Sequence, residues 1–173
     1  MLMRRLITIL AIATIASVSM SAQNFTEGSS QFKAQVGLLS SYSYVKIPPV
    51  SVSYDYCVVD FGDAGSIGVG GILDFMSEGY NSISVTDLAF GAIGTYHFTI
   101  PSVQELELYS GLMIYYNTVM VNTEYSFLDY AFNTSGFGYG AFIGAQYFFN
   151  DKMGASLQFG GMATMSAGIV FKL

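Results

Sequence analysis

The sequence predicts an all-β fold, namely an eight-stranded antiparallel up-and-down transmembrane β-barrel that follows a cleaved signal peptide. Three observations predict it. Charged residues make up only 10% of the 173-residue chain and hydrophobic residues 52%, whereas an ordinary globular domain has about 25% charged residues. Eight segments alternate bulky apolar with small or polar residues at the period of a β-strand. The charged residues in these segments share a face with the glycines, and the charge-free opposite face suits lipid.

The composition also excludes several classes of protein. Six Lys and Arg residues against 12 Asp and Glu residues argue against a nucleic-acid binder. Abundant aromatic and β-branched residues argue against disorder. Because Cys57 is the single cysteine, a disulfide framework cannot form. The length suits one domain.

The amino terminus has the order of a secretory signal peptide. Two arginines precede the uncharged apolar run Leu6–Val18, and small residues follow it. A transmembrane helix needs about 20 apolar residues, so this run is too short to span a membrane comfortably. We predict a signal peptide over 1–22 and a barrel domain over 23–173, with cleavage after Ala22 or, alternatively, after Ser21. The arginine pair leaves twin-arginine export as a further alternative.

Each predicted strand sets bulky apolar residues on one face against small, polar or charged residues on the other. In chain order, the strands cover residues 32–38, 50–57, 67–75, 87–98, 106–114, 137–149, 156–160 and 168–173. One apolar residue and its polar neighbour from each strand, in the same order, are Phe32 and Lys33, Tyr54 and Asp55, Leu73 and Asp74, Tyr96 and His97, Leu106 and Glu107, Tyr147 and Gln146, Leu157 and Gln158, and Phe171 and Lys172. In a barrel, the second member of each pair points inward.

The distribution of charge separates a membrane barrel from a soluble β-sandwich or lipocalin-like domain. The charged residues within the strands all lie on the glycine-rich face; they are Lys33, Asp55, Asp74, Asp87, Glu107 and Lys172. In the soluble alternative that face would be the outside, and the aromatic face would fill a core ~10 Å thick. So much aromatic area would overfill such a core, which favours the barrel.

Link lengths and aromatic positions agree with the barrel. The links over 40–49, 77–85 and 117–134 are long or polar, as extracellular loops are, and the alternate links are mostly tighter. The link near Ala163 is short where a loop was expected. Aromatic residues gather at the predicted periplasmic strand ends, as in an interfacial girdle; they are Phe32, Tyr54, Tyr56, Tyr96, Phe98, Tyr147, Phe149 and Phe171.

The inward polar residues predict an interior network rather than an active site. Its members are Lys33, Asp55, Asp74, His97, Glu107, Gln146, Gln158 and Lys172. We expect the carboxylates to pair with the two lysines and fill the lumen, with His97 as a partner for the carboxylates. A lipid-directed enzyme would need a hydroxyl activated by His97, and the sequence indicates none. Cys57 is expected to be a small interior side chain, and Gly68–Gly71 opens no helix, which excludes a phosphate loop.

The carboxy-terminal half resembles small outer-membrane β-barrel proteins of the OmpA/OmpX-like kind. The resemblance rests on residues 144–154, 157–160 and 168–173, and on the shorter segments Tyr96–Phe98 and Leu108–Leu112. It implies that the outer-membrane assembly machinery recognises the last strand, and it implies no catalytic activity. Such families often carry a basic and an acidic residue at the positions of Gln146 and Gln158, so a neutral hydrogen-bonded pair is expected here. The final residue of such families is usually aromatic, and Leu173 departs from this.

These observations predict an integral outer-membrane protein with a structural or surface-contact role, no enzymatic activity, no cofactor and no metal. The alternatives are a narrow channel that weakly favours cations and, third, a lipid-directed barrel enzyme. Expected partners are outer-membrane lipid and the assembly machinery, but no nucleic acid; an external partner is left open. A possible external contact loop holds Tyr125, Phe127, Tyr130 and Phe132. Alternatively, these rings pack on one another where the strands extend beyond the membrane.

Overall fold

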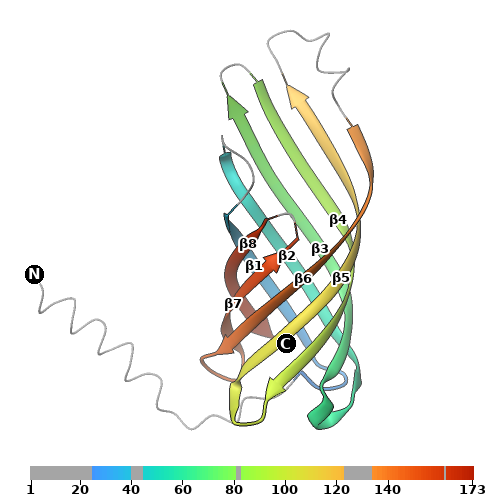
Figure 1. The fold of residues 1–173 in the computed structure, drawn as a ribbon, viewed down its shortest axis with the longest axis vertical. Coiled ribbons are helices and arrows are strands. Elements are labelled where there is room, and N and C mark those ends of the chain that lie inside the picture. Colours follow the sequence, from blue (N-terminus) through green and yellow to red (C-terminus); the bar gives the residue numbers. More distant parts are fainter. Residues whose placement is uncertain (1–24, 40–44, 81–82, 123–133, 162) are drawn as a thin grey trace, which may run out of the picture.

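The chain forms one closed barrel of eight antiparallel strands, in which each strand pairs with its sequence neighbours and the last pairs with the first (Figure 1). The computed structural model describes residues 25–39, 45–80, 83–122, 134–161 and 163–173. The elements are β1 (Ser30–Leu39), β2 (Val45–Asp60), the 3-10 turn η2 (Gly62–Ala64), β3 (Ser66–Tyr80), β4 (Ile83–Ile100), β5 (Val103–Asn122), β6 (Thr134–Phe148), β7 (Met153–Gly160) and β8 (Met165–Lys172). The predicted fold class is confirmed.

The amino-terminal prediction and the presence of helices are considered separately from the strands. The predicted signal peptide, residues 1–22, lies outside the described residues. Within the part of the chain that the structure describes, no helix has the length and apolar character needed to cross a membrane.

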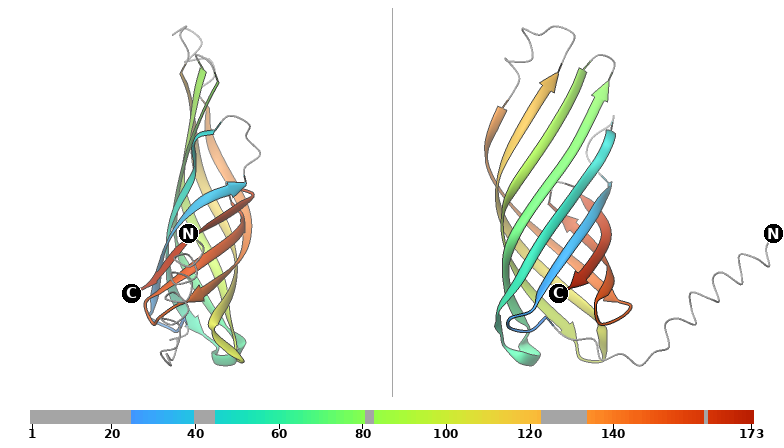
Figure 2. Two further views of the ribbon diagram at one scale, coloured as in Figure 1. Left: turned by 90° about the vertical axis from the view of Figure 1, so that its left-hand side faces the viewer. Right: turned by 180° about the vertical axis from the view of Figure 1, so that it is seen from behind.

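The strands on one side are longer than predicted. β4 has 18 residues and β5 has 20, whereas β7 and β8 have eight each. β3, β4, β5 and the start of β6 therefore rise above the β7–β8 side and give the barrel an oblique rim (Figures 1 and 2). The link predicted over 77–85 is wrong in extent, because β3 continues to Tyr80 and β4 begins at Ile83. Polar residues there made the strand ends resemble a loop.

The two ends of the barrel differ in structure. The turn end carries η2 and the short turns between β4 and β5 and between β6 and β7. The rim end is the opposite, oblique end, toward which β3, β4 and β5 extend. As predicted, the link between β7 and β8 is short, since only residues 161–164 separate the two strands.

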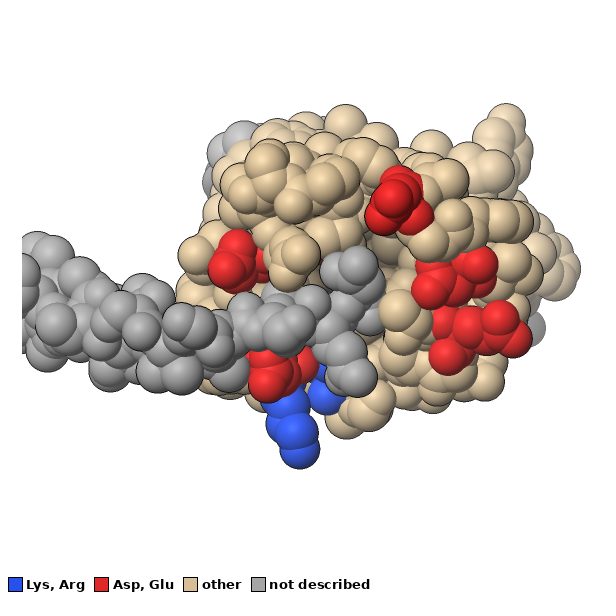
Figure 3. Space-filling view, turned by 90° about the horizontal axis from the view of Figure 1, so that it is seen from below, with Lys and Arg blue, Asp and Glu red and all other residues tan. Residues whose placement is uncertain are grey.

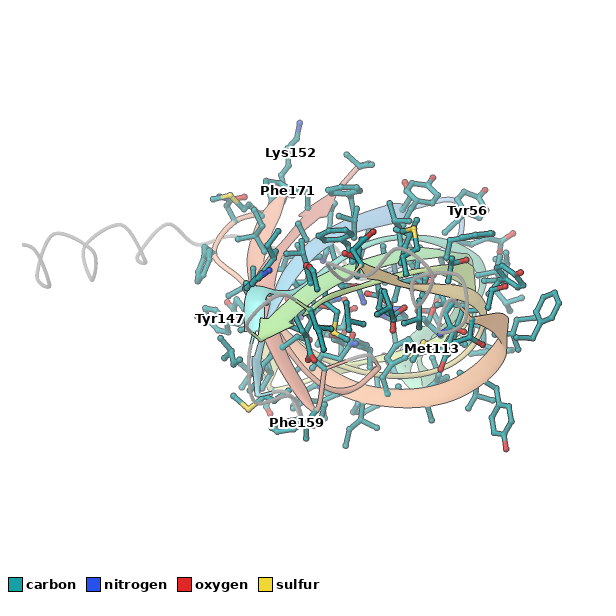
Figure 4. All side chains as sticks on the ribbon, turned by 90° about the horizontal axis from the view of Figure 1, so that it is seen from above. Tyr56, Met113, Tyr147, Lys152, Phe159 and Phe171 are labelled. Carbon is teal, nitrogen blue, oxygen red and sulfur yellow. The ribbon has the colours of Figure 1, made fainter. Side chains whose placement is uncertain are left out.

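The two faces of the sheet are opposite in character to those of a soluble protein. The predicted inward charges are buried, with Asp55 fully buried and Lys33, Asp74, Asp87 and Glu107 between 1% and 8% exposed; Lys172 is half-buried. Outward apolar side chains are open to the surroundings, among them Leu112 at 70% and Tyr139 at 87%. Seen from above, Met113 points into the barrel while Tyr56, Tyr147, Phe159 and Phe171 point away from it (Figure 4). This arrangement is that of a transmembrane barrel.

Aromatic rings mark both membrane boundaries. The predicted girdle lies at the turn end, where Phe32 pairs with both Tyr54 and Phe171. A second group lies toward the rim end, where the ring centroids of Tyr116 and Phe137 are 5.2 Å apart and the Tyr116 hydroxyl donates to Ser135 Oγ at 2.9 Å. Ten residues of a tilted strand separate Phe137 from Tyr147, about 25 Å along the barrel axis. That span matches the apolar band of an outer-membrane barrel.

Inward glycines leave room for interior rings that lie across neighbouring strands. A Cβ atom built on Gly144 would lie 2.5 Å from the Tyr109 ring and 2.6 Å from the Leu157 carbonyl oxygen. On the outward face, a Cβ on Gly94 would meet nothing within 4 Å. Glycine at position 144 is therefore a packing requirement, and glycine at position 94 is not.

Gly144→Ala should destabilise the barrel by about 1–3 kcal/mol, because the added methyl group overpacks the interior against Tyr109. Gly94→Ala is the matched control and should be neutral or slightly stabilising, since alanine loses less backbone entropy than glycine. Urea titration in lipid vesicles, followed by the fraction of protein that migrates as folded on an unheated gel, measures both. Equal unfolding midpoints for the two variants would contradict the packing role of Gly144.

Candidate functional site

A buried polar cluster centred on His97 occupies the barrel interior near the turn end. His97 Nε2 lies 2.9 Å from Asp55 Oδ2, and His97 Nδ1 lies 2.5 Å from Glu107 Oε1. The Thr95 hydroxyl donates to the same Asp55 oxygen at 2.6 Å. β2, β4 and β5 thus place an imidazole between two carboxylates, which is the arrangement expected for His97 as an interior partner.

β3 lies between β2 and β4, and it permits the contact between Asp55 and His97 because its inward residues at this level are glycines. Asp55 on β2 is opposite Gly70 on β3, and the next inward position, Gly68, is opposite Thr95 on β4. A Cβ on Gly68 would overlap both Asp55 Oδ1 and Thr95 Oγ1. Gly68 therefore lets the Asp55 carboxylate reach across β3 to His97.

Glutamine side chains complete the cluster around Glu107. Gln31 Nε2 donates to Glu107 Oε1 at 3.3 Å, and Gln146 Nε2 donates to the same oxygen and to Gln31 Oε1 at 2.7 Å. The predicted Gln146–Gln158 pair is wrong. Gln158 instead accepts from the Tyr109 hydroxyl at 3.1 Å, because the strand register sets it opposite Gly144 and not opposite Gln146.

The lysines contact rings within the same interior. Lys33 Nζ lies 3.9 Å from the centroid of the Tyr109 ring, and Lys172 Nζ lies 3.7 Å from that of Phe148. Asp74, the remaining predicted member, lines a separate small cavity of about 10 Å³ together with Gln158. The predicted network is therefore divided: Asp55, His97, Glu107 and Gln146 are linked by hydrogen bonds, and Asp74 and Gln158 lie rimward of them.

An interior apolar layer, which the sequence analysis did not assign, fills the lumen rimward of the His97 cluster. It consists of Ile72, Ile93, Tyr109, Met113 and Phe142, each 3–8% exposed. The centroids of the Tyr109 and Phe142 rings lie 6.1 Å apart in an edge-to-face arrangement. Strand alternation could have found the layer, because Met113 and Phe142 share the inward face with the glycines.

The turn end of the lumen is covered by the segment before β1. Phe25 is 3% exposed, and its ring centroid lies 4.2 Å from that of His97. The Cys57 thiol, fully buried on the inward face, donates to the Phe25 carbonyl oxygen at 3.6 Å. A cavity of about 180 Å³ lies beside this segment and is lined in part by Asp60 and Asp63.

The surface of the turn end is acidic. Figure 3 shows Asp and Glu side chains gathered on this end of the molecule. The described acidic residues with exposed or half-buried side chains there are Glu27, Asp60, Asp63, Glu105 and Asp151. We call these residues the acidic turn-end surface, and its charge favours cations over anions at this mouth of the barrel.

Both ring nitrogens of His97 contact carboxylates, so neither is directed at a hydroxyl that it could activate as a base. Within the described ranges, no group of three His, Cys, Asp or Glu side chains is arranged to hold a metal ion. The predicted contact residues Tyr125, Phe127, Tyr130 and Phe132 lie outside the described residues.

The fold is similar to solved outer-membrane barrels. The N-terminal β-barrel domain of Pseudomonas aeruginosa OprF matches with a TM-score of 0.54 and 16% identity, over 85% of this chain and 98% of that one. OprG from Pseudomonas aeruginosa matches with a TM-score of 0.52 and 12% identity, over 87% and 99%. Ail, the attachment invasion locus protein of Yersinia pestis, in complex with the heparin analogue sucrose octasulfate, matches with a TM-score of 0.51 and 14% identity, over 86% and 100%. No protein-family model matches the chain, and no curated protein is significantly similar to it.

Proposed function

We propose that this protein is an integral outer-membrane β-barrel with a structural or surface-contact role and without enzymatic activity. The observation that carries the proposal is the filled lumen: the interior apolar layer lies directly rimward of the His97 cluster, and both are buried. A barrel of eight strands has an interior just wide enough for side chains. Its partners are outer-membrane lipid along the outward face and, through β8 (Met165–Lys172), the machinery that assembles such barrels.

The long strands support contact at the cell surface. Rimward of the Tyr116 and Phe137 rings, the outward side chains of β4 and β5 change from apolar to mainly polar; they include Ser84, Thr86, Thr118 and Asn122. Polar outward residues suit water and not hydrocarbon, so this part of the sheet would stand above the membrane. We call the part of β3, β4 and β5 rimward of these rings the extended wall.

A narrow cation channel is the second candidate, because the acidic turn-end surface borders a cavity of about 180 Å³ beneath the His97 cluster. Passage would require the interior apolar layer to move. Conductance measured in planar bilayers separates this candidate from a closed barrel.

Cysteine labelling on intact cells tests the location and orientation. Met120→Cys places a thiol on the outward face of the extended wall, where the side chain is 39% exposed, and Lys152→Cys places one in an exposed turn at the other end. In a Gram-negative host, a membrane-impermeant maleimide should label the first variant on intact cells and the second only after permeabilisation. The native Cys57 is fully buried and should stay unlabelled. Equal labelling of both variants on intact cells would contradict an outer-membrane barrel with this orientation.

Shortening the extended wall tests the contact role. Ser77 pairs with Thr86, so replacing residues 78–85 with Asn-Gly should close the same hairpin nearer the membrane. Cells that carry this variant should lose most of the attachment or aggregation that the full-length protein confers, while the barrel still migrates as folded on unheated gels. Full attachment by a folded, shortened barrel would count against a contact role for this hairpin.

A further inference from the structure

Two inward carboxylates lie close together on the rim side of the interior apolar layer. Asp74 on β3 is 6% exposed, and Asp87 on β4 is 8% exposed. Asp87 pairs with Met76, two residues beyond Asp74 on the same face of β3, so the two carboxylates are diagonal neighbours across the β3–β4 ladder. The charge of Asp87 acts on that of Asp74. The barrel therefore buries two like charges near each other, at the foot of the extended wall.

The basic side chains of the chain lie elsewhere. Both arginines belong to the predicted signal peptide, and all four lysines are described. Lys33 and Lys172 lie near the His97 cluster, where the charge of Glu107 acts on both. Lys152 belongs to the turn between β6 and β7, and Lys46 is exposed and lies against the outward side of Gly79. Among the described residues, neither Asp74 nor Asp87 therefore forms a salt bridge.

One oxygen atom of this pair is buried without a partner. The Asn117 side chain hydrogen-bonds to Asp87, but Asp87 Oδ1 is buried and accepts no hydrogen bond. Asp74 accepts a hydrogen bond from the Ser51 side chain. Burial of an ionised carboxylate without a cation is unfavourable, and a second negative charge nearby adds to the cost. The unpartnered oxygen and the two like charges together point to a bound cation.

We propose that Asp74 and Asp87 bind one calcium ion between them, which departs from the sequence prediction of no metal. Calcium prefers carboxylate and water oxygens and accepts irregular coordination, whereas magnesium demands a nearly octahedral shell. Asp74 and Ser51 line the cavity of about 10 Å³, which has room for about one water molecule to complete the coordination. A proton shared by the two carboxylates is the alternative, and the experiment below distinguishes the two.

The composition of the site also sets its expected strength. It offers two carboxylates, and no third acidic, histidine or cysteine side chain is grouped with them among the described residues. Few charged ligands make a weak calcium site, so the dissociation constant should be about 0.1–1 mM. The site depends on the inner face of β3 and β4 and not on the surface-contact role proposed above.

Calorimetric titration of the full barrel with calcium chloride, in a zwitterionic detergent that leaves both ends accessible, tests the proposal. Asp87→Asn keeps the shape of the side chain and removes its charge, so it should weaken calcium binding about tenfold or more. Asp74→Asn should do the same and replaces the first variant if that one does not fold. The double variant Asp60→Asn and Asp63→Asn is the control, because it removes two charges from the acidic turn-end surface; it should bind calcium at this site as the wild type does.

Urea unfolding in the same detergent, read from folded migration on unheated gels, gives a second measurement. Relative to a chelator, about 5 mM calcium should raise the unfolding midpoint of the wild type by about 0.5–1.5 M. Magnesium at the same concentration should raise it less than half as much. Without calcium, Asp87→Asn should unfold at a higher urea concentration than the wild type, because the repulsion from Asp74 is gone. Calcium should no longer change the midpoint of this variant.

Three results would overturn the proposal: a wild-type midpoint that calcium does not change, an equal calcium shift in Asp87→Asn and wild type, or an equal shift with magnesium. A midpoint that depends on pH but not on calcium would assign a shared proton to the pair instead. These measurements use the purified barrel, whereas labelling and attachment are measured on cells. A failure of the calcium site and a failure of the proposed function are therefore seen in different experiments.

Discussion

Glu107→Leu is expected to lower the free energy of unfolding by about 3–5 kcal/mol, the usual effect of removing one partner from a buried ionic cluster. Glu107 is 1% exposed and accepts from Gln31 and Gln146 and contacts His97 Nδ1. Leucine would leave these groups buried without their common acceptor. Urea titration of the protein in lipid vesicles, read from the fraction that migrates as folded, measures the change.

Glu105→Leu is the matched control for this substitution. Glu105 lies two residues nearer the turn end on the same face of β5, but its side chain is only half-buried. Its replacement should change the free energy of unfolding by no more than about 0.5 kcal/mol. If the two variants unfold at the same urea concentration, Glu107 does not hold the cluster together.

Removing the interior apolar layer should turn a closed barrel into a conducting one. In planar bilayers the wild type should show no large, stable openings, because Met113 and Phe142 fill the lumen at 4% exposure each. The double variant Met113→Ala and Phe142→Ala should show discrete openings, with a reversal potential shifted toward that of the cation because of the acidic turn-end surface. Each truncation should also cost about 2–5 kcal/mol of stability, so folded migration must be checked first.

The control for conductance uses outward neighbours on the same two strands. Ile114 and Ile143 are 65% and 63% exposed and lie next to Met113 and Phe142 in sequence. Ile114→Ala with Ile143→Ala removes a similar volume from the lipid face and should leave the bilayer silent. Large stable openings of the wild type would reverse the order of the two candidate functions and favour the channel.

The faces of the strands were predictable because they depend on local geometry. Successive side chains of a strand point to opposite faces. An apolar residue followed directly by a charged one, such as Phe32 and Lys33 or Tyr54 and Asp55, therefore already distinguishes the outward face from the inward face. Strand length was not predictable in the same way. Ser77–Tyr80 and Ile83–Thr86 carry the composition of a loop, and their backbone pairing across the β3–β4 ladder determines that they are strands.

The sequence predicts which kind of group each interior residue contacts, but it does not predict which individual residue supplies that group. His97 was expected to meet carboxylates, and it lies between Asp55 and Glu107. Which carboxylates it meets depends on the stagger of non-adjacent strands and on the absence of a side chain at Gly68, neither of which a single strand reveals. The same stagger separates Gln146 from Gln158. The interior apolar layer is harder to predict, because Met113 and Phe142 carry no charge and only strand alternation places them inside the barrel.

The oblique rim has a consequence for how the barrel forms. The longest strands, β4 and β5, are neighbours in sequence and can pair as a hairpin at little cost in chain entropy. The seam joins β1 to β8, whose partners Gln31 and Lys172 lie at opposite ends of the barrel sequence, and β8 has only eight residues. Closure of the barrel therefore joins the two strands that are farthest apart in the sequence, through one of the shortest ladders. Folding should proceed from the tall side toward the seam, and unfolding should begin by separation of β8 from β1.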